Sequence, residues 1–248
     1  GTGALIAGPK PDGTTTGGNA RGARAVDLQT NRTAATQVAS GSDSFAAGLN
    51  NTASYRGVSI GNGNSSGNGG SVAIGAANTA SGLFSAAIGR ACTASGSNAT
   101  AIGFQAESTN NSSFALGYRS KSDRYGMVAE SGSYFSATGD AQRGRFVLAN
   151  KTTNDTATEL FLGANNRLTI PSGKVLALTI NISGIKSDGS AVAHYLRQYA
   201  LKNVSGTTSE VYAPVTIGTD NAAGTSIALS ANDSNDALNV EVTCVAAE

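Results

Sequence analysis

The stretch that decides the fold is SVAIG at residues 71–75, which returns as SAAIG at 85–89, ATAIG at 99–103 and SFALG at 113–117. These copies are 14 residues apart, and GVSIG at 57–61 extends the series towards the N-terminus. Within each copy, bulky residues alternate with small ones. That period of two is typical of a short strand with one buried face. The sequence therefore predicts a repeat architecture.

The second half of each repeat reads NTASG at 78–82 and CTASG at 92–96, a second short strand closed by a glycine turn. Two strands and two turns make one coil, and coils stack at a strand spacing of about 4.8 Å. We expect residues 44–125 to form a parallel β-roll. Its predicted core is Ile60, Val72, Ile74, Ile88, Ile102, Phe114 and Leu116.

The small residues between these bulky positions, such as Ala73 and Ala87, are predicted to let another chain approach closely. A core this thin is marginal for one chain. The sequence therefore favours several copies packed around an axis.

The runs SVAIG at 71–75 and ASGSNATAIG at 94–103 resemble the head repeats of trimeric autotransporter adhesins of the YadA-like type. This resemblance implies a left-handed parallel β-roll with three chains to a bundle. Residues 18–29 and 37–41 also resemble segments that precede such repeats in bacteriophage tail-fibre proteins. No heptad stalk and no membrane-anchor barrel is visible, which favours a phage or phage-like tail fibre. Residues 1–43 are then predicted to be an entry segment that brings three chains together.

The repeat fades after Tyr118, and residues 126–142 are predicted to be a connector. From residue 143 the strands lengthen, and turns recur every 8–12 residues. This pattern predicts a β-sandwich or jelly-roll-like domain at 143–248. The runs at 145–152 and 187–195 resemble C-terminal domains of phage tail fibres, which implies a receptor-binding tip.

The composition excludes several classes of function. Charged residues make up 13% of the chain, and the formal net charge is +1. Without a run of Lys or Arg, nucleic-acid binding is not expected. No apolar stretch approaches the ~20 residues of a spanning helix, so membrane insertion is not expected.

Cys92 and Cys244 are far apart in the sequence and are predicted to pack as small apolar residues rather than to form a disulfide.

We predict that the chain is not an enzyme and binds no cofactor or metal. It has one histidine, His194, and no nucleophile elbow, zinc motif or P-loop. A polysaccharide-cleaving tailspike stays open as a second alternative, because paired carboxylates could meet in space. The carboxylates considered are Asp155, Glu159, Asp188 and Glu210.

Candidate receptor-binding residues lie on one predicted strand and on loop tips. Tyr195, Arg197 and Tyr199 share one side of a strand, where rings could stack on sugars and Arg could donate hydrogen bonds. The alternative, which we favour, is a packing strip. The full set is His194, Tyr195, Arg197, Tyr199, Asp188, Asp220 and Asn232.

The turns of the repeat exclude two other kinds of β-roll. A calcium-binding roll needs aspartate in every turn, and an ice-binding array needs a regular threonine grid; neither pattern is present. The roll could be a spacer or could itself bind. We expect an extracellular homotrimer that attaches to a bacterial surface glycan or protein, with other tail or baseplate proteins as partners. The alternative is a head fragment of a bacterial trimeric adhesin.

Overall fold

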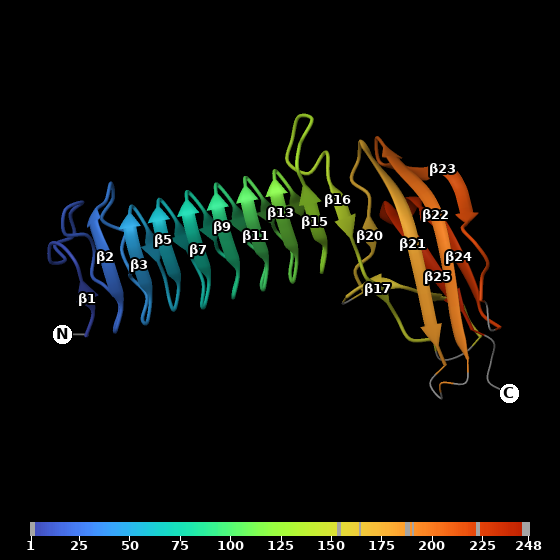
Figure 1. The fold of residues 1–248 in the computed structure, drawn as a ribbon, viewed down its shortest axis with the longest axis horizontal. Coiled ribbons are helices and arrows are strands. Elements are labelled where there is room, and N and C mark those ends of the chain that lie inside the picture. Colours follow the sequence, from blue (N-terminus) through green and yellow to red (C-terminus); the bar gives the residue numbers. More distant parts are fainter. Residues whose placement is uncertain are drawn as a thin grey trace. The chain divides into compact units, whose positions relative to one another are not determined.

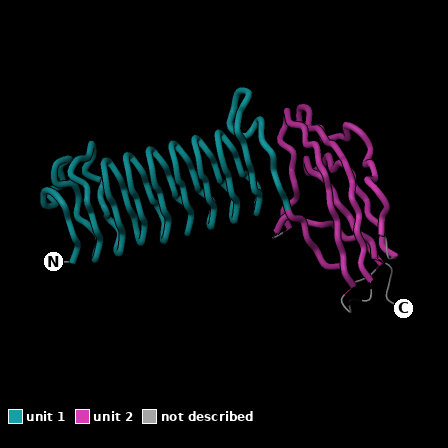
Figure 2. The backbone as a smooth tube through the Cα atoms, viewed as in Figure 1, with its two compact units in different colours: residues 1–146 teal, residues 147–248 magenta. Residues whose placement is uncertain are grey.

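The computed structural model describes residues 3–152, 155–163, 165–186, 189, 191–221 and 224–244. Strands make up 50% of it and helix 1%, so the prediction of an all-β fold is confirmed. The chain divides into two compact units, residues 1–146 and residues 147–248 (Figure 2).

The first unit is a parallel β-solenoid of about 7 turns. Its larger sheet has ten strands, all paired in parallel except β15 with β16 (Figure 1). In sheet order they are β1 (Leu5–Ile6), β2 (Val26–Asn31), β3 (Phe45–Leu49), β5 (Val58–Asn62), β7 (Val72–Ala76), β9 (Ala86–Arg90), β11 (Thr100–Phe104), β13 (Phe114–Tyr118), β15 (Val128–Ser131) and β16 (Arg143–Arg145).

A second parallel sheet is built from two-residue strands. In chain order they are β4 (Thr52–Ala53), β6 (Ser65–Ser66), β8 (Thr79–Ala80), β10 (Thr93–Ala94), β12 (Glu107–Ser108) and β14 (Lys121–Ser122). Each coil joins one long strand to one short strand. Successive coils align residue for residue, with Ile74 opposite Ile88 and Thr79 opposite Thr93. The predicted 14-residue coil is therefore confirmed.

The repeated glycine is required at the next-to-last residue of long strands such as β7. Gly75 has a φ of +118°, and a Cβ atom there would lie 2.0 Å from the carbonyl oxygen of Gly89. A side chain would have to displace the backbone of the next coil, so only glycine fits. This close approach explains why the motif ends on glycine in every coil.

The interior of the roll holds the small column, not the bulky one. Ala73, Ala87 and Ala101 are fully buried, whereas Ile60 and Leu116 are 36% and 40% exposed. The predicted core was therefore assigned to the wrong face of the strand. Ile60, Val72, Ile74, Ile88, Ile102, Phe114 and Leu116 all face outwards and are partly or largely exposed. The reason is space, because a coil closed by two strands leaves room for alanine, serine or cysteine but not for isoleucine.

Buried asparagines satisfy the polar backbone at one edge of this interior. The side-chain Nδ2 of Asn64 donates to the carbonyl oxygens of Ile60 (2.9 Å) and Gly75 (2.8 Å). Asn51 and Asn78 occupy equivalent positions in their coils. These bonds satisfy the asparagine side chains themselves, which a thin interior requires of any buried polar group.

The roll extends beyond the recognisable repeat at both ends. At the N-terminal end β1 and β2 join the parallel ladder, within residues 1–43 that were expected to be an entry segment. At the other end β15 and β16 continue the sheet, within the expected connector and across the expected boundary at residue 143. The unit boundary lies instead after Phe146.

The first coils contain a buried ion pair. The Arg21 Nε atom lies 2.6 Å from the Asp27 carboxylate, and Arg32 approaches the same carboxylate to 3.6 Å. All three side chains are almost fully buried. Because a buried charge must be paired, removing one of these side chains would leave the others uncompensated and destabilise the end of the roll.

The second unit consists of antiparallel sheets. One holds β21 (Lys174–Ile185), β22 (Val192–Val204) and β23 (Thr207–Thr216); the other holds β18 (Thr158–Glu159), β20 (Leu168–Thr169), β24 (Ser226–Asn232) and β25 (Ala237–Thr243). A two-stranded sheet pairs β17 (Leu148–Ala149) with β19 (Phe161–Leu162), and a short helix, η1 (Asp233–Asn235), joins β24 to β25.

Hydrogen bonds join the β21–β23 sheet to the turn between η1 and β25. Asn203 in β22 donates to the Asp236 carboxylate at 2.8 Å, and the Thr208 hydroxyl donates to the same carboxylate at 2.9 Å. Tyr199 and Leu201 of β22 and Val240 of β25 are buried. This arrangement agrees with a sheet domain following the roll.

Candidate binding surfaces

The outer face of the long strands carries a continuous apolar stripe. Two columns of side chains run along it, one in register with Val72 and one in register with Ile74. The first column is Val26, Phe45, Val58, Val72, Ala86, Thr100, Phe114 and Val128. The second is Leu28, Ala47, Ile60, Ile74, Ile88, Ile102 and Leu116.

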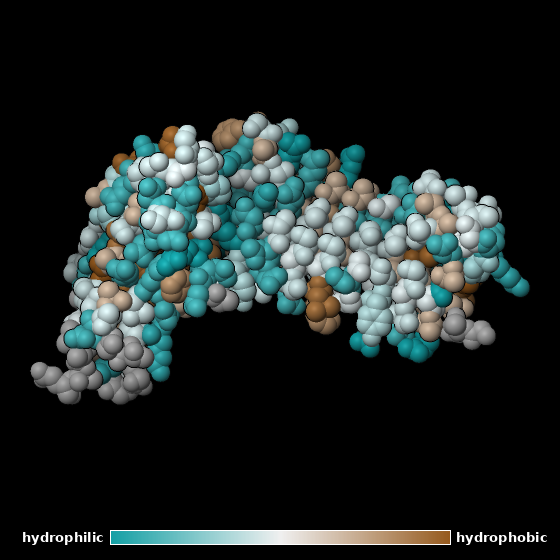
Figure 3. Space-filling view, turned by 180° about the vertical axis from the view of Figure 1, so that it is seen from behind, coloured by the Kyte–Doolittle hydropathy of each residue, from teal (hydrophilic) through white to brown (hydrophobic). Residues whose placement is uncertain are grey.

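This stripe is unusual for a surface that faces water alone. All its members are partly or largely exposed in the single chain. It ends where Glu130 follows Leu116 in the second column. By contrast, Figure 3 displays one face of the roll mostly in pale colours of intermediate hydropathy, with brown residues in isolated groups. A long ordered row of Val and Ile therefore makes the outer strand face a candidate interaction surface.

In the second unit, the structure brings together four of the predicted receptor-binding residues. Arg197 makes two bonds of 2.7 Å to the Asp220 carboxylate, and its guanidinium lies 5.5 Å from the ring centroid of Tyr195. The backbone of exposed His194 pairs with Asn221, the neighbour of Asp220. The guanidinium of Arg197 lowers the pKa of Asp220 by hydrogen bonding, and the carboxylate in turn raises the pKa of Arg197.

Most of this cluster is engaged within the protein. Tyr195 is buried and its hydroxyl bonds to Thr225. Tyr199 is fully buried, and its hydroxyl donates to Glu210 at 2.7 Å. Burial, and then the bond to Glu210, raises the pKa of Tyr199. The contacts of the Tyr195–Arg197–Tyr199 strip are those of the packing alternative.

The remaining candidates lie elsewhere. Asn232 is the N-cap of η1 and accepts a bond from the backbone of Asn235 at 3.1 Å. Asp188 lies outside the described residues. Of the carboxylates considered for glycoside cleavage, Glu159 pairs with Arg167 at 2.7 Å and Glu210 bonds Tyr199. Among the described residues, no group of three or more His, Cys, Asp or Glu side chains is placed to hold a metal ion.

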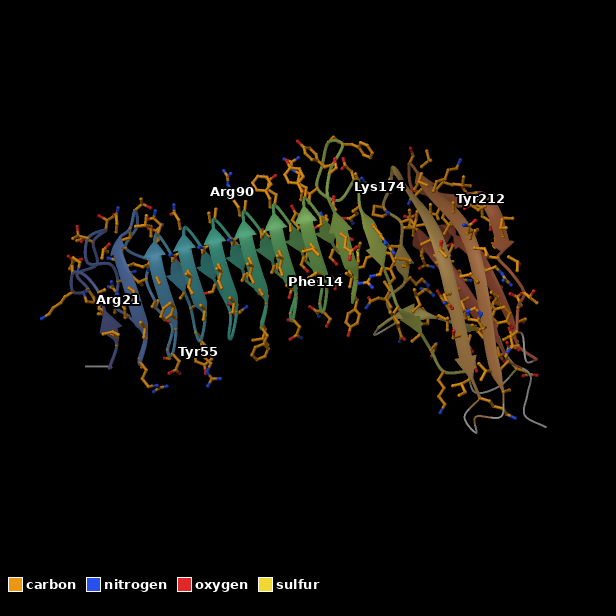
Figure 4. The ribbon with its side chains drawn as sticks, in the orientation of Figure 1. Arg21, Tyr55, Arg90, Phe114, Lys174 and Tyr212 are labelled. Carbon is orange, nitrogen blue, oxygen red and sulfur yellow. The ribbon has the colours of Figure 1, made fainter. Side chains whose placement is uncertain are left out.

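Sequence reasoning missed an aromatic ladder at the edge where the long strands end. The rings of Phe104 and Tyr118 stack with centroids 5.3 Å apart and planes 7° apart. Tyr134, from the loop between β15 and β16, follows at 5.5 Å. Arg90 lies over Phe104 at 5.3 Å, and Arg119 lies over Tyr134 at 3.9 Å. Figure 4 displays Arg90 projecting from this edge of the roll.

The repeat itself held a signal for most of this ladder. Arg90, Phe104 and Tyr118 each follow the repeated glycine of their coil, so they are spaced by 14 residues and lie side by side on neighbouring strands. Tyr134 gave no such signal, because its place depends on how the loop folds back.

Comparison with known proteins gives one match. The model described as the YadA head domain repeat matches twice, at residues 68–90 and 94–120. No curated protein and no solved structure matches the chain. The described residues include no helix long and apolar enough to span a membrane.

Proposed function

We propose that this chain is one subunit of a homotrimeric, extracellular attachment fibre that fixes its parent particle or cell to a bacterial surface. Two observations support this: the YadA head domain repeats at residues 68–90 and 94–120, and the apolar stripe on the outer face of the roll. Of these, the stripe carries the proposal.

The stripe supports association because the roll has little core of its own. Its interior is a cluster of alanines with Cys92, while its isoleucines and valines point outwards. Burying a Val or Ile side chain contributes about 1.5–3 kcal/mol. Copies packed along this stripe would supply the apolar core that one chain lacks. The resemblance to YadA-like heads implies that three copies do so.

Trimeric presentation would make attachment multivalent. Three identical weak sites raise avidity without any single tight contact. The parallel ladder pairs strand with strand from β1 to β15, so the sheet offers few open edges along its length.

The finer proposal is a tail fibre of a phage or phage-like particle. It rests on the resemblance of residues 18–29, 37–41, 145–152 and 187–195 to tail-fibre proteins. A bacterial trimeric adhesin would use the same roll. The two differ in the parent gene, since the adhesin requires a coiled-coil stalk and a membrane anchor. In both cases the chain binds rather than cleaves.

Whole-cell binding tests the proposal. The labelled full-length chain is incubated with a panel of bacterial strains, and saccharide release is followed in parallel. Saturable binding to particular strains without release of reducing sugar supports an attachment fibre. Binding to none of the strains, or release of sugar, contradicts it.

A further inference from the structure

The loop between β15 and β16 projects from the roll at the edge where the arrowheads of β11 and β13 lie (Figure 1). Phe135 in this loop is 84% exposed, and Tyr134 beside it caps the aromatic ladder. Two arginines, Arg90 and Arg119, flank the same ladder. These side chains are together called the ladder platform.

The loop is held rigidly despite its exposure. The Asp140 carboxylate accepts hydrogen bonds from the backbone N–H groups of Phe135 (2.9 Å), Ser136 (2.6 Å) and Ala137 (2.7 Å). At its base, the Gln142 side chain makes two bonds of 2.7 Å to the backbone of Lys121. A bulky apolar ring held out on a fixed backbone loses little conformational entropy when it binds.

The rings of the aromatic ladder and the ring of Phe135 differ in whether their faces are free to bind a ligand. Phe104, Tyr118 and Tyr134 use their faces on one another and on the two guanidinium groups. Among the described residues, Phe135 has no ring or cation against it, so its faces are free for a ligand. The C–H face of a pyranose ring is a partner of matching shape and polarity.

The charge of the platform is positive. Within the described part of the chain, neither Arg90 nor Arg119 makes an ion pair with a carboxylate. Arg119 bonds the neutral side chain of Gln105 at 2.7 Å, and Asp140 is engaged by backbone N–H groups. Guanidinium groups donate in a planar fork that fits a carboxylate or a phosphate.

We propose that the ladder platform binds an acidic saccharide chain, with Phe135 stacking on a sugar face and Arg90 and Arg119 each binding a carboxylate or phosphate of that chain. This rests on the proposed attachment function and assigns one contact to the roll itself. The roll is then more than a spacer.

The test compares two variants with two matched controls. Phe135→Ala and Arg90→Gln remove side chains that make no hydrogen bond within the described protein. Phe84→Ala and Arg56→Gln remove an exposed phenylalanine (64%) and an exposed arginine outside the platform. Arg56 lies over Tyr55, which Figure 4 displays at the opposite edge of the roll.

The probes are tri-galacturonate, mannose 6-phosphate and the neutral galactotriose, measured by calorimetry on the full-length protein. We expect binding of an acidic probe and not of the neutral one, with an affinity loss of about tenfold or more in the two platform variants alone. The identity of the tighter acidic probe separates a carboxylate ligand from a phosphate ligand. Binding of neither acidic probe, or equal binding by platform and control variants, overturns the proposal.

Cell binding separates this proposal from the broader one. If strains are bound while neither acidic probe binds, the attachment function stands and the platform proposal fails. If acidic saccharides bind through the platform while no strain is bound, the platform stands and the attachment function fails.

Discussion

Asn51 and Asn64 are joined in the interior of the roll: the Oδ1 atom of Asn51 accepts from both the backbone N–H (2.9 Å) and the Nδ2 (3.0 Å) of Asn64. Asn78 repeats the relationship on Asn64 one coil later, at 3.1 and 2.9 Å. This series of buried asparagines ends at Cys92, whose N–H donates to the side chain of Asn78. Each rung links two coils by side-chain bonds in addition to the strand pairing.

Replacing Asn64 by Ala should therefore destabilise the roll. The change removes the bonds from Asn64 to the carbonyl oxygens of Ile60 and Gly75 and takes away the side-chain acceptor of the Asn78 N–H. A cost of about 1–3 kcal/mol follows from leaving a buried donor unsatisfied. Denaturant unfolding measures it, with the exposed Asn68→Ala as control. Equal stability of the two variants would show that the rung contributes nothing.

The thiol of Cys92 should resist alkylation in the folded protein. Burial raises its pKa above the ordinary value of 9.0, so at pH 8 the reactive thiolate is scarcer than for a free thiol. Iodoacetamide labelling followed by mass spectrometry should modify the partly exposed Cys244 first. Cys92 should react only in denaturant. Equal labelling of both residues in the native protein would contradict the buried position.

The two faces of β9 should respond in opposite ways to substitution. Ala87→Leu forces a larger side chain into the filled interior and should cost about 1–3 kcal/mol or prevent folding. Ile88→Lys should leave the coil folded, because its side chain faces outwards, but should weaken association. Circular dichroism follows folding and sedimentation follows assembly. A folded Ala87→Leu beside an unfolded Ile88→Lys would restore the opposite core assignment.

The loop that carries Phe135 should stay ordered into acid. The N–H of Ala137, followed by those of Phe135 and Ser136, lowers the pKa of Asp140 well below its ordinary value of 3.8. The stabilisation is therefore present above the ordinary pKa and is lost only as the pH falls through the lowered one. Hydrogen exchange of these amides should show protection at pH 4. Asp140→Asn should expose them, and loss of protection in the unaltered protein at pH 4 would refute the clamp.

Arg197 should act in the stability of the second unit rather than in recognition. Arg197→Met breaks the paired bonds to Asp220 and leaves that partly buried carboxylate unpaired. We expect a lower midpoint of thermal unfolding, because the pair of charge-assisted hydrogen bonds is lost. Thermal unfolding and cell binding should be measured together. Loss of cell binding with unchanged stability would assign Arg197 to the receptor site.

The repeat made the coil, its parallel stacking and its glycine turns predictable from sequence. A period of two gives alternation but does not say which face is inside. Here the decisive fact is the width of the coil. The uniform smallness of Ala73, Ala87 and Ala101 marks the interior, whereas hydrophobicity alone pointed to Ile74 and Ile88. In a single-chain core the bulky apolar residues lie inside. If the bulky residues pack against other chains, they lie outside instead.

Other features depend on contacts between distant residues. The pairing of β2 with β3 carries no repeat motif, so the first coils looked like a separate segment. Tyr134 meets Tyr118 from a loop that side-chain bonds of Gln142 and Asp140 hold in place. The period-two spacing did place Tyr195, Arg197 and Tyr199 on one face. Their partners, Thr225, Asp220 and Glu210, lie 30, 23 and 11 residues away and could not be read from spacing.

The most direct test of the trimeric fibre is the mass of the intact chain in solution, measured by sedimentation equilibrium across a range of concentrations. Packing of three copies along the apolar stripe predicts a mass three times that of the 24.6 kDa chain, which falls in Ile88→Lys and is unchanged in Phe84→Ala. A mass of 24.6 kDa at all concentrations would contradict the account.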